Sequence, residues 1–145
     1  FAQVGIKPVL YGATEAWKVV DSLKGRVAGV LFTQRVIDLD PEQGAKKRNR
    51  YQELVSAGIP VAFHSAAEEG AADLPVLATY AVSQGMSPEA ALRALTSDAA
   101  EMYGIADRVG RLVPGLDGDV VLLDGSPLDP SSSVLRVWVQ GREVR

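Results

Sequence analysis

Three short segments in the first half of the chain are largely apolar instead of alternating with polar residues: Lys7–Tyr11, Val27–Phe32 and Pro60–Phe63. They are rich in Val, Leu and Phe, and Gly or Pro lies near their boundaries. Strands that are buried on both faces have this pattern, because helices cover both sides of a parallel sheet. The pattern therefore predicts three parallel β-strands.

Stretches with helical periodicity lie between these strands. One helix is predicted over 15–23, capped by Thr14 and ended by Gly25, and a second over Lys46–Ala57. The polar segment Arg35–Ala45 is predicted to be a loop. A strand, helix, strand order needs crossover connections, which indicates βαβ units. Because no Gly-rich dinucleotide fingerprint is present, a piece of a (β/α)₈ barrel competes with a doubly wound sheet.

Further helices follow the third strand. A helix is predicted over Leu74–Ser83. Ser87 followed by Pro88 is a specific start signal, because serine caps helices and proline fits their first position. Either Thr96 or Ser97 is predicted to begin one more short helix.

The pattern changes to β-structure near the end of the chain. Val120–Leu123 and Val134–Val139 are predicted strands, and Arg142–Val144 follows the second of them. Gln140 and Gly141 separate the last two segments, and two turn residues ending in Gly predict a tight hairpin.

Composition narrows the class of protein. The 145 residues are 47% hydrophobic and 23% charged, with a formal net charge of -3, which fits one ordinary domain with a core. This charge predicts no nucleic-acid partner, and no apolar run approaches the roughly 18 residues of a membrane span. The absence of cysteine excludes disulfides and thiolate chemistry. One basic cluster, Lys46, Lys47, Arg48 and Arg50, is predicted to lie on a solvated helix face.

The start of the sequence predicts a truncated product. Its first residue is Phe1, no signal peptide is visible, and the segment 1–5 resembles the tail of a helix. We therefore expect a missing N-terminal portion, and the sequence predicts no compartment.

Candidate chemistry gathers at the predicted carboxyl ends of strands. His64 is the only histidine and follows a strand, so it is a candidate general base or metal ligand. The alternative is a local hydrogen bond beside Ser65. Glu68 and Glu69 could converge with His64 or simply be solvated, and Tyr11 could contact a substrate or fill space. One histidine cannot hold a catalytic zinc ion, which needs about three protein ligands.

The end of the chain is similar to the metal-dependent amidohydrolase superfamily, in particular its imidazolonepropionase-like branch. The stretches that carry the resemblance are Asp107–Val121 and Val137–Val144. The resemblance implies an α/β fold in which 1–106 form the last three βα units of a (β/α)₈ TIM barrel. Residues 107–145 would then form a β segment of the accessory domain.

Two upstream positions differ from the family pattern. Gly58–Phe63 resembles the family's eighth strand, and alignment places Ala66 where the family has its metal-binding aspartate. Tyr11 falls where the family has a metal-ligating histidine at the end of strand six. These differences favour altered metal chemistry or its loss.

The resemblance implies hydrolysis of C–N bonds, other than peptide bonds, in small or cyclic amides by a metal-bound hydroxide. It implies a small-molecule substrate and a divalent, zinc-type metal in the intact protein, with none expected in this chain, which is not catalytically complete alone. His64 is the candidate catalytic residue, and Tyr11 and Ser65 are candidate substrate-binding residues. The alternative is a non-catalytic binding or structural module, favoured by Tyr11 and Ala66. Open sheet edges predict self-association.

Overall fold

The computed structural model describes residues 1–32, 37–40, 44, 46–65 and 70–145. Its first half contains β1 (Val9–Tyr11), α1 (Val20–Leu23), β2 (Gly29–Phe32), β3 (Ile37–Asp40), β4 (Lys46–Asn49), α2 (Arg50–Ser56) and β5 (Val61–Phe63), with 3₁₀-helices η1 (Ala2–Val4) and η2 (Ala16–Val19). The second half contains η4 (Gly70–Asp73), α3 (Leu74–Ser83), α4 (Pro88–Leu95), α5 (Ser97–Met102), β6 (Val120–Leu123), β7 (Val134–Val139) and β8 (Arg142–Glu143). The fold is therefore mixed α/β.

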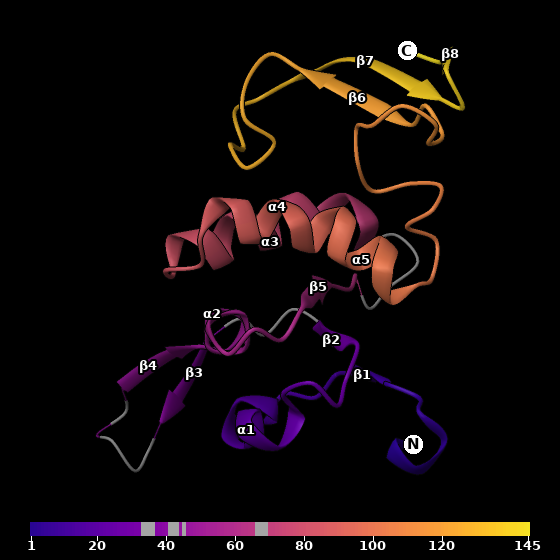
Figure 1. The fold of residues 1–145 in the computed structure, drawn as a ribbon. Helices are drawn as coiled ribbons and strands as arrows, with labels where there is room; N and C mark the ends of the chain where they lie inside the picture. Colours follow the sequence, from indigo (N-terminus) through magenta and orange to yellow (C-terminus); the bar gives the residue numbers. More distant parts are fainter. Residues whose placement is uncertain (33–36, 41–43, 45, 66–69) are drawn as a thin grey trace.

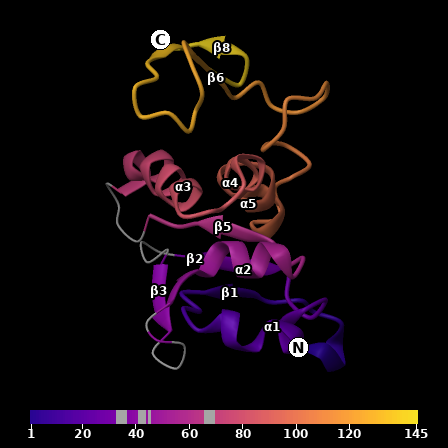
Figure 2. The ribbon, with the colours of Figure 1, turned by 90° about the vertical axis from the view of Figure 1, so that its left-hand side faces the viewer.

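The three predicted strands form one parallel sheet in the order β1-β2-β5. Each begins one or two residues later than predicted. Helices α3, α4 and α5 lie between this sheet and a second sheet of β6, β7 and β8 (Figures 1 and 2). The parallel sheet thus has helices packed against it, as the unbroken apolar strands require.

One face of the parallel sheet builds the main core. Phe32 of β2 and Phe63 of β5 both pack on Tyr51 of α2, with ring centroids 4.4 Å and 4.8 Å apart. Leu31 and Ala62 alternate with these phenylalanines and are buried, yet they lie outside that core cluster. Because strand side chains alternate between faces, Leu31 and Ala62 belong to the opposite face of the sheet.

The segment before α2 corrects the sequence prediction. Lys46–Asn49 is a strand that pairs antiparallel with Ile37–Asp40, where a loop and the start of a helix were expected. The helix begins only at Arg50, because the Asn49 side chain accepts a hydrogen bond from the backbone N–H of Gln52 at 3.0 Å. Asn49 therefore ends the strand and caps the helix.

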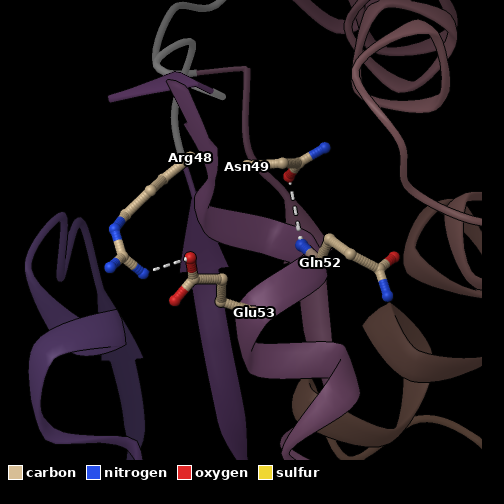
Figure 3. Close-up of polar contacts among 4 residues, drawn as sticks. All are labelled: Arg48, Asn49, Gln52 and Glu53. Atoms are coloured by element: carbon tan, nitrogen blue, oxygen red, sulfur yellow. Dashed lines mark hydrogen bonds and ion pairs between the residues drawn. The ribbon is translucent and has the colours of Figure 1, made fainter. Parts of the chain in front are cut away.

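The prediction of a solvated basic helix face is also wrong. Arg50 is 2% exposed, and Lys47 and Arg48 belong to β4. Arg48 lies over the Trp17 ring, 4.8 Å from its centroid, and its Nη1 donates to Glu53 Oε1 at 2.7 Å. Figure 3 shows the Arg48 and Glu53 pair beside the Asn49 cap. Arg48 therefore connects β4 to η2 and to α2.

The predicted helix over 15–23 is divided into η2 and α1. Thr14 does not cap it: Glu15 holds the N-cap position of η2, without a side-chain hydrogen bond. Gly25 lies just beyond α1 with φ +72°, which fits the predicted stop. A helical segment was correctly predicted here, but its first part, Ala16–Val19, is a 3₁₀-helix and only Val20–Leu23 is an α-helix.

The predictions for the second half are confirmed almost residue by residue. The bounds of α3, β6 and β7 match, and Ser87 Oγ accepts from the N–H of Ala90 at the start of α4. Gln140 and Gly141 have φ of 49° and 75°, as a tight hairpin between β7 and β8 requires. Among the described residues, no helix has the length and apolar character needed to cross a membrane.

Candidate functional site

The carboxyl end of the parallel sheet brings two of the candidate residues together. Tyr11 is the last residue of β1, and His64 follows β5 directly. Their ring centroids are 4.9 Å apart with an interplanar angle of 80°, an edge-to-face contact. The two rings meet although β2 separates their strands in the sheet.

Strand register explains why these rings share a face. Tyr11 pairs with Leu31, and Leu31 pairs with Ala62, so these three form one row across the sheet. His64 lies two residues after Ala62, and alternation returns its side chain to the same face. Its backbone N–H donates to the carbonyl of Phe32 at 2.6 Å, which extends the ladder beyond β5.

The exposure of the site suits contact with a ligand. Tyr11 is 60% exposed, whereas His64 and Ser65 are half-buried. An imidazole can accept or donate a proton near neutral pH, and a phenol or a serine hydroxyl can hydrogen-bond a carbonyl. Ser65 adjoins His64 in the chain. Ala66, Glu68 and Glu69 lie outside the described residues, so convergence of the two glutamates with His64 stays a prediction.

Tyr51 packs against the face of the sheet opposite to that of Tyr11 and His64. It lies between Phe32 and Phe63, the residues that end β2 and β5. Burial raises the pKa of its phenol far above the ordinary value, which outweighs the opposite effect of nearby Arg50, so the ring stays neutral. This role of Tyr51 depends on the packing of two strands, which the helical pattern of Lys46–Ala57 does not show.

The β3–β4 hairpin is the feature that sequence reasoning missed. It follows the carboxyl end of β2, the end of the sheet that carries Tyr11 and His64. A local signal that could have located the start of α2 is Asn49 followed three residues later by Gln52, a pattern typical of a helix start. That signal places the helix start after Lys46, Lys47 and Arg48, at Arg50.

The described side chains offer few donors for a metal ion. Across the part of the chain that the structure describes, no three His, Cys, Asp or Glu side chains gather in a group that could hold a metal. At the site itself, one imidazole and one phenol are too few ligands for a catalytic metal. The described residues therefore do not fit a metal by themselves.

A separate cavity of about 940 Å³ lies between helices α4 and α5 and strand β6. Leu92, Tyr103 and Val121 are among its lining residues. Tyr11, His64 and Ser65 are not among its lining residues.

Comparison with known proteins gives consistent matches. A model of the amidohydrolase family matches residues 27–145. A solved amidohydrolase from Thermotoga maritima MSB8 is similar over 99% of this chain and 38% of its own, at 27% identity and a TM-score of 0.84.

Curated relatives match shorter stretches. An imidazolonepropionase of Geobacillus kaustophilus is 33% identical over 104 residues, 69% of this chain and 23% of the relative. An adenine deaminase 2 of Jannaschia sp. is 41% identical over 64 residues, 44% of this chain and 10% of the relative. The chain thus spans less than a quarter of these curated relatives.

Proposed function

Because this chain belongs to the amidohydrolase family, we propose that it contributes to an active site that hydrolyses non-peptide C–N bonds in small or cyclic amides. The observation that carries the proposal is the contact of Tyr11 with His64 at the carboxyl end of a parallel sheet. Similarity to an imidazolonepropionase and to an adenine deaminase supports a nitrogen-containing small molecule as substrate.

The proposal includes a domain division. Residues 1–106 would form the last three βα units of a barrel, and 107–145 a β segment of an accessory domain. The parallel order β1-β2-β5 and the separate antiparallel sheet support this division. The chain spans 38% of the Thermotoga amidohydrolase, so we propose that further polypeptide is needed for catalysis.

The roles of the site residues follow from their chemistry. His64 would take a proton from the attacking water and deliver it to the leaving nitrogen as the C–N bond breaks. The hydroxyl groups of Tyr11 and Ser65 would hydrogen-bond the substrate and hold its carbonyl in place. A divalent metal of zinc type belongs to the proposal only for a longer polypeptide, because the described donors do not fit one.

The test is a substitution of His64 in the full-length gene product, assayed for ring opening or ammonia release on a panel of cyclic amides and amino-substituted heterocycles. His64→Gln should lower kcat by about 10²- to 10⁴-fold, the usual contribution of a general acid or base. Arg142→Lys, an exposed change in β8, is the control and should leave kcat unchanged. Equal activity of His64→Gln and the parent would contradict the proposed role.

A parent protein that is inactive on the whole panel would support the alternative, a non-catalytic binding or structural module. The same preparation should be analysed for metal by mass spectrometry. Less than about 0.1 ion per full-length chain would count against a metal-dependent reaction, which needs a stoichiometric ion.

A further inference from the structure

We propose that Tyr11 selects substrates with a planar, unsaturated ring by stacking on it. This inference rests on the proposed function, because it assigns a substrate class to the same site. It begins from the edge-to-face geometry of the Tyr11 and His64 rings, whose planes are inclined by 80°.

The geometry leaves aromatic surface of Tyr11 available beside His64. An edge-to-face pair uses the edge of one ring and part of one face of the other. Tyr11 remains 60% exposed while it makes this contact. A second aromatic ring can therefore pack against Tyr11 within reach of the imidazole.

The strand presents this surface rigidly. Val9, Leu10 and Tyr11 pair in register with β2, and the N–H of Gly12 donates to the carbonyl of Leu31 at 2.9 Å. A side chain on a fixed strand with two rotatable bonds loses little entropy when it binds a ligand. Tyr11 thus has the properties of a rigid aromatic wall.

The two residues that share a row of the sheet with Tyr11 are buried and leave no room for a ligand. Leu31 is 7% exposed and Ala62 is fully buried, and both lie in the same row of the sheet as Tyr11. A ligand must therefore lie toward the carboxyl end, against Tyr11 and His64. Three adjacent strands span about 10 Å, which matches the width of a planar molecule of one or two rings.

A matched pair of probes separates stacking from hydrogen bonding. 2-Pyridone and 2-piperidone are six-membered cyclic amides of similar size, but only 2-pyridone is planar and unsaturated. Because His64 is the only histidine, its ring-proton NMR signals report binding at this site without ambiguity. The 145-residue chain should bind 2-pyridone about fivefold more tightly than 2-piperidone, the preference expected for one aromatic contact.

Substitutions assign the preference to Tyr11. Tyr11→Phe should retain it, since the ring remains, and Tyr11→Leu should reduce it to less than about twofold. Tyr80→Leu removes another exposed tyrosine, on α3, and should leave the preference unchanged. The comparison of two probes in the unsubstituted chain needs no variant to fold.

The outcomes distinguish a failure of the stacking role of Tyr11 from a failure of the proposed ligand site at His64. Equal binding of both probes, or a preference that survives Tyr11→Leu, would overturn stacking and leave the proposed hydrolysis at His64 standing. If neither probe moves the His64 signals, the proposed ligand site itself fails, and the stacking role with it.

Discussion

Tyr51 is a residue whose burial makes the stability of the whole chain depend on pH. It has no exposed surface, and burial raises the pKa of its phenol above the ordinary 10.0. The folded chain keeps Tyr51 neutral while the unfolded chain ionises it. Its contribution to the free energy of unfolding is therefore complete below pH 10 and is lost above it, by about 1.4 kcal/mol per pH unit. Urea unfolding at several pH values from 9 to 11 gives the dependence of the free energy of unfolding on pH. This dependence should be weaker for Tyr51→Phe than for the parent, and unchanged for the exposed Tyr80→Phe. A slope in Tyr51→Phe equal to that of the parent would contradict this.

Substitutions at Gly110 and Gly115 separate the cost of a steric clash from the cost of backbone strain. Their φ angles are +93° and +94°, so an added side chain strains both alike. A Cβ at Gly110 would also lie 2.7 Å from Ala100 Cβ and 3.1 Å from the Thr96 carbonyl, whereas nothing lies within 4 Å at Gly115. Thermal unfolding should show Gly110→Ala to be less stable than Gly115→Ala by about 1 to 3 kcal/mol. Equal losses would mean that the loop after α5 does not pack on that helix in solution.

At the scale of elements, Asn49 joins β4, α2 and the end of α3. Its Oδ1 caps α2, and its Nδ2 donates to the carbonyls of Ala81 at 3.0 Å and Gln84 at 3.2 Å. Asn49→Asp keeps the cap and removes both donors, so its free energy of unfolding should be lower than that of the parent by about 1 to 2 kcal/mol. Asn49→Ala also removes the cap, so its free energy of unfolding should be lower still. Equilibrium unfolding in urea measures both. An Asp variant as stable as the parent would show that the link to α3 contributes nothing.

Elements were predictable where their signals are local. Ser87 and Pro88 start α4 within two positions, and unbroken apolar runs identify β1, β2 and β5. The β3–β4 hairpin was missed because its signal lies in the pairing. Asp38 is opposite Arg48 and Asp40 is opposite Lys46 in the register, and neither strand shows this alone. The basic run therefore suggested a helix face until its partner strand was known.

At the scale of the whole molecule, the site was predictable in part for a similar reason. Tyr11 and His64 could be chosen because Tyr11 ends one predicted strand and His64 follows another, and the carboxyl ends of parallel strands lie at one edge of a sheet. Their contact across β2 needed the register, which no local pattern supplies. The packing of Tyr51 on Phe32 and Phe63 likewise joins segments that are distant in the sequence, so only the fold reveals it.

The sheet edges lead to a prediction about assembly. Within the described residues, β1 and β5 each pair on one side only, and β6 is one of the two edge strands of the second sheet. An unpaired apolar edge is a template for another strand, so sedimentation should show an average mass that rises with concentration.

Val121 is 54% exposed on β6, and Val121→Lys should weaken this association by placing a charge on the edge. Leu112→Lys adds the same charge in a loop at a residue that is 80% exposed, and should weaken it less. A mass of one chain at every concentration would refute self-association, and equal effects of the two lysines would show that β6 is not the edge involved.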